Sequence, residues 1–125
     1  SHVRSKGSSA ELLVRQIAHR LGFRFRLHRR DMPGTPDLVF PRRRKVIFVN
    51  GCFWHRHRCR KGRSMPETRR DFWEAKFTAN LRRDRAARRR LQAGGWQVLT
   101  IWECEVAARN MEELTDLICS FLGPL

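Results

Sequence analysis

Residues 46–59 have the sequence VIFVNGCFWHRHRC, which joins two different patterns. The first four residues, Val46-Ile47-Phe48-Val49, form a continuous apolar run of strand length. Such a run predicts a central strand that is buried on both faces. The last eight residues hold two cysteines, two histidines and two large aromatic side chains, with arginines between them. This density of thiols and imidazoles indicates a metal site that directly follows the buried strand.

Apolar periodicity and turn residues place the other elements around this strand. The elements expected in chain order are a helix that opens at a capping box in residues 8–11 and ends at Gly22, a strand over 23–28, a strand over 37–40, the strand described above, a helix over about 68–93, a strand over 96–102 and a last helix that carries residues 106–121. This order predicts a single α/β domain over residues 1–125, with a mixed central sheet flanked by helices.

The chain is strongly basic, which constrains its partners. It has 27 Lys+Arg against 12 Asp+Glu, a net charge of +15 in 125 residues, and most of the excess is arginine. The guanidinium group binds phosphate through a planar fork, whereas lysine offers a point charge. The composition therefore predicts a nucleic-acid partner, with a solvated basic surface as the alternative. No apolar run approaches the roughly 20 residues of a membrane span, and no signal peptide is visible, so we expect a cytoplasmic protein without a membrane partner.

Four residues are candidate metal ligands. Cys52, His57 and Cys59 lie within the cluster, and Cys104 comes just after the last expected strand. Two or three thiolates with an imidazole make a closed tetrahedral site, which is typical of structural zinc. The alternative is that a cysteine is only a small buried apolar residue, which is the role we expect for Cys119 on the apolar face of the last helix.

Two further residues are candidates for catalysis. If the cluster's other histidine binds metal, His55 remains available for proton transfer near neutral pH, although it could instead be a surface histidine that contacts phosphate. Asp37 begins a strand after a Pro-Gly-Thr-Pro turn. A carboxylate beside a basic surface suggests Mg²⁺ held between enzyme and phosphate, and the alternative is an aspartate that caps a turn.

Aromatic and basic side chains indicate how DNA would be held. Phe53 and Trp54 are adjacent, so they cannot both face one core from an extended segment, and exposed rings could wedge between base steps. Trp73 could join them or lie in the core. The long helix carries nine basic residues between positions 69 and 90. With the total charge of the chain, such a run favours a face that follows phosphates over a merely solvated one.

The chain closely resembles the very short patch repair (Vsr) endonucleases. The matching stretches are the helix around Glu11, residues 25–28, Pro33-Gly34-Thr35-Pro36-Asp37, residues 46–59, Phe72-Trp73 with Lys76 and Asn80, Arg83-Asp84, and residues 95–104. The Gly-Cys-Phe-Trp-His core with its distant Trp-Glu-Cys is the most specific part. The resemblance implies a divergent PD-(D/E)xK, restriction-endonuclease-like fold. Members of the family nick one DNA strand at a T:G mismatch, 5′ of the mispaired thymine, to start repair of deaminated 5-methylcytosine.

The resemblance also assigns roles by position. Asp37 matches the Mg²⁺-binding aspartate, with the backbone carbonyl of Val49 as its companion; His55 matches the histidine that activates water, and Glu11 lies near the active centre. It implies that Cys52, His57, Cys59 and Cys104 bind structural Zn²⁺, that Phe53, Trp54 and Trp73 enter the base stack, and that Lys76 and Asn80 face the mispaired bases. The implied partners are double-stranded DNA with a T:G mismatch, mismatch-repair proteins and a repair polymerase, met by a monomer at the bacterial nucleoid.

The chain departs from the family pattern in two places. Asn50 stands where members often carry histidine or an acid, and an amide cannot take a proton at neutral pH, so we expect lowered activity. The family also has a longer N-terminal stretch with a methionine that helps to grip the mismatch, so we expect residues 1–8 to form a flexible or truncated arm. Two alternatives follow: a related nuclease without mismatch preference, or a catalytically impaired zinc-containing DNA-binding module. The presence of both Asp37 and His55 favours an enzyme.

Overall fold

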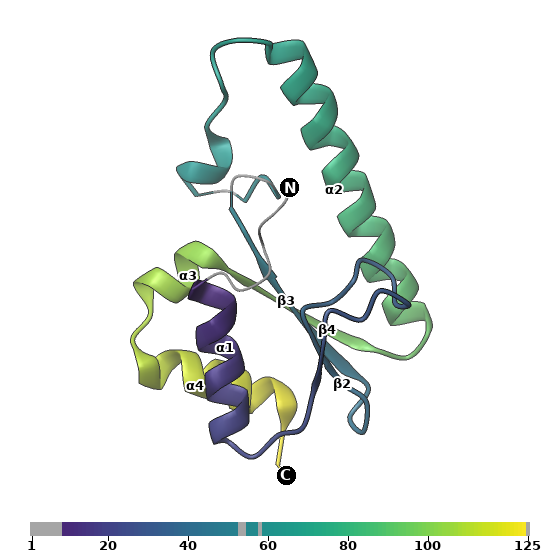
Figure 1. Ribbon diagram of the computed structural model, residues 1–125, viewed down its shortest axis with the longest axis vertical. Helices are drawn as coiled ribbons and strands as arrows, with labels where there is room; N and C mark the ends of the chain where they lie inside the picture. Colours follow the sequence, from purple (N-terminus) through teal and green to yellow (C-terminus); the bar gives the residue numbers. More distant parts are fainter. Residues whose placement is uncertain (1–8, 53–54, 58, 125) are drawn as a thin grey trace.

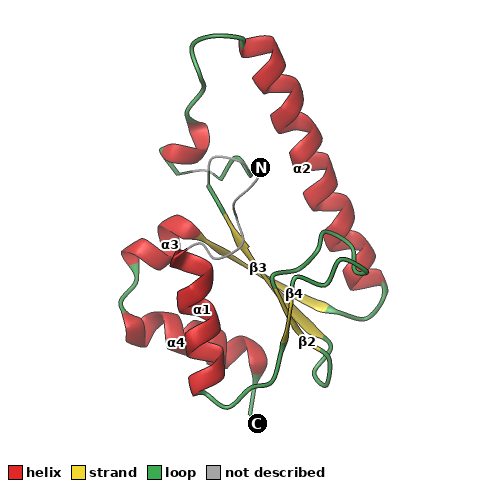
Figure 2. Ribbon diagram, viewed as in Figure 1, coloured by secondary structure: helices red, strands yellow, loops and turns green. Residues whose placement is uncertain are grey.

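The computed structural model describes residues 9–52, 55–57 and 59–124 of the chain (Figure 1). In chain order the elements are α1 (Ser9–Arg20), β1 (Arg26–Leu27), β2 (Leu38–Phe40), β3 (Lys45–Asn50), the short 3₁₀ helix η1 (Lys61–Arg63), α2 (Arg70–Ala93), β4 (Gln97–Trp102), α3 (Glu103–Ala108) and α4 (Met111–Leu122) (Figure 2). The strands form one mixed sheet in the order β1-β2-β3-β4. The first three are antiparallel, and β4 runs parallel to β3 after the crossover through α2.

The sheet separates two apolar layers of unequal size. Alternate residues of a strand point to opposite faces, so Ile47 packs with α1 and α4 while Val46 packs with Leu91 of α2. Both valine and isoleucine are fully buried, as the apolar run in residues 46–49 predicted. The expected central strand is therefore confirmed, with helices on both of its faces (Figure 1).

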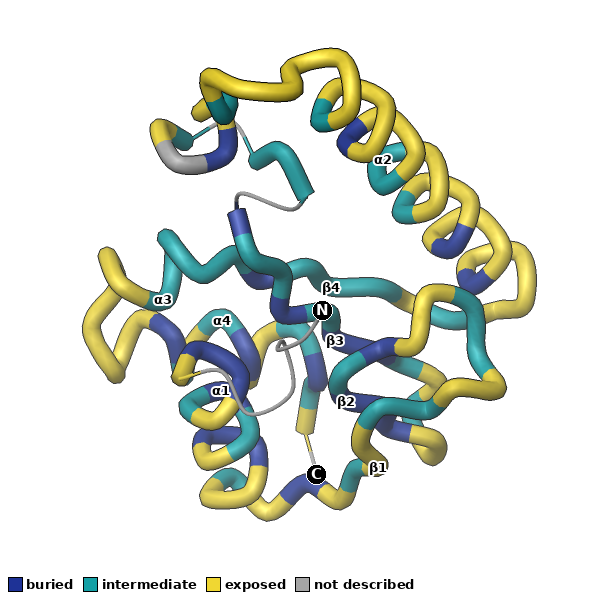
Figure 3. Tube along the Cα trace, turned by 45° about the horizontal axis from the view of Figure 1, so that its top comes forward, coloured by how far each residue is buried: buried dark blue, intermediate teal, exposed yellow. Residues whose placement is uncertain are grey.

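Helix α2 buries few of its side chains against the rest of the protein. Only Phe77, Ala87 and Leu91 are classed as buried among its described side chains, and Figure 3 shows the helix as a mostly exposed cylinder. Its N-terminal half extends past the end of the sheet, above the loop that carries the cysteine and histidine cluster (Figure 1). None of the helices in the described residues has the length and apolarity to cross a membrane. The basic residues of α2 are therefore exposed on the surface of the protein.

Three expectations about the elements are wrong in detail. The strand expected over 23–28 is only Arg26–Leu27, because Phe23 and Phe25 leave the sheet and pack their rings on Phe40, with centroids 6.3 and 5.7 Å away. The last helix is in fact two, α3 and α4. Arg109 ends the first helix, and Asn110 caps the second by accepting a 2.8 Å hydrogen bond from the Glu113 backbone.

The third error concerns Cys119, which we expected to be buried on the apolar face of the last helix. It is exposed. The core-facing stripe of α4 is Leu114, Ile118 and Leu122, and residue 119 is one position off that stripe. Ser8, part of the expected capping box of α1, lies outside the described residues.

Candidate active site and metal centres

The four predicted zinc ligands come together at the end of the two parallel strands. The register pairs Asn50 with Trp102, and each strand is followed two residues later by a cysteine, Cys52 and Cys104. His57 Nδ1 lies 3.3 Å from the Cys104 Sγ and 3.8 Å from the Cys52 Sγ. With Cys59 included, all four donor atoms lie within 4.8 Å of one another. Ligands of tetrahedral zinc are about 3.3–3.8 Å apart, so this group has the donors and spacing for zinc.

Packing around the cluster fixes its histidine and one of its thiols. The His57 ring stacks on Trp102 with centroids 4.3 Å apart, and the Cys52 amide donates to the Glu103 carboxylate at 3.1 Å. Gly62 leaves no room for a side chain, because a Cβ there would lie 1.9 Å from the His57 carbonyl oxygen. Any larger residue at 62 would therefore have to displace backbone that carries a ligand.

The cluster's thiols have opposing proton affinities. Burial raises the pKa of Cys52 to about 12, whereas a hydrogen bond from the Gly62 backbone lowers the pKa of Cys59 to about 6. A bound cation would hold such thiols as thiolates, since only the thiolate coordinates metal. The described residues therefore contain a closed sulfur-rich group that could hold a metal such as zinc.

A second group of possible ligands combines two carboxylates with an imidazole. Glu11 of α1, His28 just after β1 and Asp37 just before β2 have donor atoms within 4.8 Å of one another. His28 Nε2 lies 2.9 Å from Glu11 Oε2 and 3.7 Å from Asp37 Oδ1. Glu11 is 1% exposed, the one buried charged residue in the described chain. A carboxylate held this deeply requires cations or hydrogen bonds around it.

The pKa of the Asp37 carboxyl group is raised to about 6, mainly by burial. The charge of Glu11 also raises this pKa, whereas the hydrogen bond from the Val49 amide and the charge of His28 lower it. A buried carboxyl group whose pKa is raised, with a second carboxyl group beside it, is typical of a site that gains a cation in its working state.

The backbone of Val49 faces Asp37. Its amide donates a 2.7 Å hydrogen bond to Asp37 Oδ2. In an extended strand the N–H and C=O of one residue point to the same edge, so the Val49 carbonyl also points toward β2. Continuing the Leu38–Ile47 register would place Pro36 opposite Val49, and proline has no N–H to offer. The carbonyl predicted to be the companion ligand is thus directed at the acidic group.

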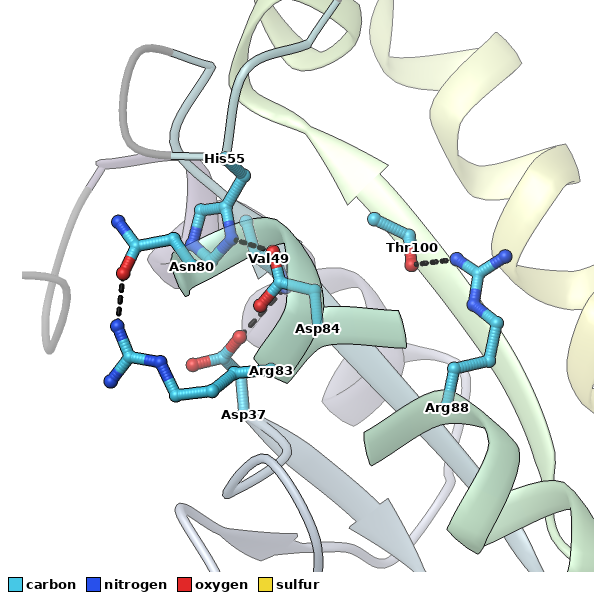
Figure 4. A network of polar contacts seen from close by, with 8 residues as sticks. All are labelled: Asp37, Val49, His55, Asn80, Arg83, Asp84, Arg88 and Thr100. Carbon is cyan, nitrogen blue, oxygen red and sulfur yellow. Dashed lines mark hydrogen bonds and ion pairs between the residues drawn. The ribbon is translucent and has the colours of Figure 1, made fainter. Parts of the chain in front are cut away.

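His55 is held by a residue that the sequence analysis gave no role. Its Nδ1 lies 2.6 Å from Oδ2 of Asp84 on α2, as Figure 4 shows. An ionised carboxylate only accepts hydrogen bonds, so Nδ1 carries the proton and Nε2 of the neutral ring is the acceptor. The His55 amide donates to the Gly51 carbonyl at 3.2 Å. Asp37 and His55 are therefore both hydrogen-bonded to backbone groups of one short segment, residues 49–51.

The DNA-facing candidates on α2 share a stripe with Asp84. Trp73, Lys76 and Asn80 are spaced by three and four residues, and Asp84 follows by another four, so all lie on one side of the helix. Trp73 is half-buried and its ring contacts those of Phe72 and Phe77. Asn80 accepts a hydrogen bond from Arg83 (Figure 4). The other two aromatic candidates, Phe53 and Trp54, lie outside the described residues.

Asn50 lies beside the catalytic candidates. It lines a hollow of about 460 Å³ between α2 and the sheet, together with His55 and Asp84. Arg56, Arg85 and Arg88 also line this hollow, so its rim is basic. An amide in that position can hydrogen-bond a water molecule or a phosphate oxygen but cannot remove a proton.

Several known proteins are similar to this chain over most of its length. The sequence model of the family described as DNA mismatch endonuclease Vsr matches residues 1–61. The type II nicking enzyme V.XorIIP of Xanthomonas oryzae pv. oryzae is 52% identical over 105 residues, which cover 84% of this chain and 76% of that protein. The chain belongs to the Vsr family of DNA endonucleases.

Two more Vsr relatives match over different spans. The DNA mismatch endonuclease Vsr of Escherichia coli K12 is 47% identical over 95 residues, which cover 76% of this chain and 59% of that protein. The type II nicking enzyme V.NmeAIP of Neisseria meningitidis serogroup A is 38% identical over 118 residues, which cover 93% of this chain and 84% of that protein. The predicted Vsr resemblance and restriction-endonuclease-like α/β fold are thereby confirmed.

Sequence reasoning missed two functional candidates of this Vsr chain, His28 and Asp84. Both stood within stretches that matched the family, but neither received a role. Asp84 did carry a signal, because it is the sole acidic residue among positions 76–93 of an arginine-rich helix. His28 carried none that a linear pattern could reveal, since its partners come from α1 and from the start of β2.

Proposed function

We propose that this chain nicks one strand of double-stranded DNA at a T:G mismatch, on the 5′ side of the mispaired thymine. The observation that carries the proposal is the pairing of His55 with Asp84 next to the carboxylates of Glu11 and Asp37 at the end of β3. A base with a fixed tautomer beside an oxygen-rich cation site suits hydrolysis of a phosphodiester. The relative from Escherichia coli, named a DNA mismatch endonuclease, supports the choice of a mismatched substrate.

Each residue has a defined task in this proposal. Asp37 and the Val49 carbonyl would hold Mg²⁺, which would supply positive charge beside the reacting phosphate group. His55 takes the proton of the attacking water on Nε2, and Asp84 stabilises the imidazolium that forms. The buried carboxylate of Glu11 adds negative charge that attracts the cation. Asn50 orients water or a phosphate oxygen without exchanging a proton, so we expect a slower enzyme than one with a base there.

The group of cysteines and a histidine is assigned a structural ion. Cys52, His57, Cys59 and Cys104 bind Zn²⁺, which fixes the loop that carries His55. Phe53, Trp54 and Trp73 enter the base stack, while Lys76 and Asn80 contact the mispaired bases. Residues 1–125 act as one monomeric domain on the bacterial nucleoid, and the nick passes to mismatch-repair proteins and a repair polymerase.

A strand-resolved nicking assay tests this function. Labelled duplexes that differ only in T:G against C:G at one position are incubated with the zinc-loaded protein and Mg²⁺. We expect one nick 5′ of the thymine in the T:G duplex alone, and none from His55→Ala. Cutting of both duplexes would indicate a nuclease without mismatch preference. Salt-sensitive binding without cutting would indicate an impaired DNA-binding module, and would make Asn50 the first residue to replace.

A further inference from the structure

We propose that His28 is a direct ligand of the catalytic cation, so that the site offers a mixed nitrogen and oxygen donor set. The consequence is a preference for Mn²⁺ over Mg²⁺ in binding. This inference rests on the proposed function, because that proposal places the cation on Asp37. It adds two ligands, the imidazole of His28 and the carboxylate of Glu11, to which that proposal gives only an electrostatic role.

The distances within the group fit one octahedral ion. With metal–ligand bonds of about 2.1 Å, neighbouring ligands are about 3.0 Å apart and opposite ligands about 4.2 Å. His28 Nε2 lies 2.9 Å from Glu11 Oε2 and 3.7 Å from Asp37 Oδ1. All three donor atoms fall within 4.8 Å of one another. The pair at 2.9 Å already has the spacing of neighbouring ligands, and Asp37 Oδ1 would have to approach His28 Nε2 by about 0.7 Å to share one face with them. The remaining positions would be left for a carbonyl, water and phosphate.

Hydrogen bonds orient the donor atoms toward the shared centre. Asp37 Oδ2 accepts from the Val49 amide, which leaves Oδ1 directed at His28. The His28 amide donates to the Asp37 carbonyl at 3.1 Å, so imidazole and carboxylate come from directly opposed positions at the open end of the β1–β2 pair. Such support around a ligand fixes its position and strengthens metal binding.

The backbone of His28 is also held in an uncommon conformation. Its φ is +48°, in the left-handed region that residues other than glycine adopt rarely. This conformation is unfavourable for a residue with a side chain, and it persists where the surrounding structure enforces it. The turn of the chain at this point brings the imidazole onto Glu11, which also lies 3.6 Å from the guanidinium group of Arg15.

The chemistry of the donors sets the expected selectivity. Mg²⁺ prefers oxygen ligands and gives up its water reluctantly, whereas imidazole suits the first-row transition metals. A site of two carboxylates, a carbonyl and one imidazole should therefore bind Mn²⁺ more tightly than Mg²⁺. The competing role for His28 is that of a counter-ion to the buried Glu11, which would give no nitrogen bond to the metal.

Pulsed electron paramagnetic resonance of bound Mn²⁺ distinguishes the two roles. The zinc-loaded, Mg²⁺-free protein is titrated with Mn²⁺, and nitrogen-14 modulation from a coordinated imidazole is recorded. We expect the modulation in the wild type and in His55→Ala, and its loss in His28→Gln, with Mn²⁺ affinity lowered about tenfold or more. His19→Gln, which alters an exposed histidine of α1, is the matched control and should change neither quantity.

Several outcomes would overturn the inference. Mn²⁺ that binds the wild type without imidazole modulation would assign His28 to charge balance alone, even if His28→Gln were too unstable to measure. Modulation that disappears in His55→Ala would assign the ligand to the other histidine. Asp37→Asn separates this from failure of the proposed function: unchanged Mn²⁺ binding in that variant would refute the metal role of Asp37 itself.

Discussion

Two groups of possible metal ligands lie around the ends of the strands, and they differ in donor chemistry although each has one imidazole. The group at Cys52 is rich in sulfur and draws its donors from a loop and from the first turn of a short helix. The group at Asp37 is rich in oxygen, and Glu11 brings it into contact with the core between α1 and the sheet. Sulfur donors that close around an ion build structure, while oxygen donors with open positions serve chemistry. The comparison predicts that removal of a ligand from the group at Cys52 lowers stability, whereas removal of a ligand from the group at Asp37 lowers nicking activity.

The largest expected effect is on stability, from Cys104→Ser. Removing one of the four donors should lower the free energy of unfolding by several kcal/mol, because structural zinc contributes directly to folding. For a chain of this size that corresponds to a melting temperature lower by more than about 10 °C. Cys119→Ser is the matched control, since that thiol is exposed and outside the group. Equal melting temperatures for the two variants, measured by calorimetry, would remove the zinc assignment.

Gly62→Ala should act on the same group without touching a ligand. A Cβ at 62 would meet the His57 carbonyl oxygen at 1.9 Å, so the loop must move and His57 with it. We expect the free energy of unfolding to fall by about 3 kcal/mol. We also expect a zinc content well below one ion per chain, as measured by atomic absorption. Gly94→Ala is the control, because its nearest contacts, at 3.5 Å, are ordinary. Full zinc content in Gly62→Ala would show that the loop accommodates the methyl group.

Asp84→Asn tests the catalytic side. The amide keeps the size of the carboxylate but cannot stabilise the imidazolium of His55, so nicking should slow by about 10²-fold or more, equivalent to about 3 kcal/mol. Single-turnover rates with saturating protein measure this, and melting temperature and zinc content should stay near those of the wild type. A rate within threefold of the wild type would mean that the 2.6 Å contact with His55 has no part in proton transfer.

Among the variants expected to change stability, Asp37→Asn should have the smallest effect, and its effects on stability and activity should have opposite signs. In the metal-free site the pKa of Asp37 rises from 3.8 to about 6, so its favourable contribution is complete below pH 3.8 and is lost as pH rises through 6. At pH 8 the neutral amide should therefore make the protein more stable than the wild type, by about 2 kcal/mol, while nicking disappears.

Urea unfolding with zinc present and Mg²⁺ absent checks that sign. At pH 4 the two proteins should be nearly equal, because the wild-type carboxyl group is then largely protonated in the folded state. Adding Mg²⁺ at pH 8 should stabilise the wild type alone and reduce the gap. A variant less stable than the wild type at pH 8 would contradict the expected penalty for the buried carboxylate.

The sequence predicted those parts of the site whose positions follow from strand register. Cys52 and Cys104 stand two residues beyond paired positions of parallel strands, so a linear pattern could bring them together. Asp37 carried its own signal as a carboxylate after a proline-rich turn. His28 could not be found in this way, because its role depends on a left-handed backbone and on partners from two other segments.

The fold shows the same division between local and tertiary causes. The apolar run in β3 and the long, arginine-rich stretch that ends at two glycines after α2 were sufficient to place both elements. The early end of β1 was hidden, because Phe23 and Phe25 alternate as strand residues do, yet both pack against Phe40. The break before α4 was visible in principle, since Asn110 and Glu113 have the spacing of a capping box.

The parallel pairing of Asn50 with Trp102 has a consequence for which changes of length the chain tolerates. One residue added between positions 46 and 52, or between 98 and 104, would move a thiol by about 3.3 Å and turn the following side chains to the other face of the sheet. The same insertion between positions 64 and 69 would merely lengthen an exposed connection to α2. Insertions and deletions that divergence leaves in such chains should therefore accumulate in that connection and spare the two strand ends, however freely the residues themselves change.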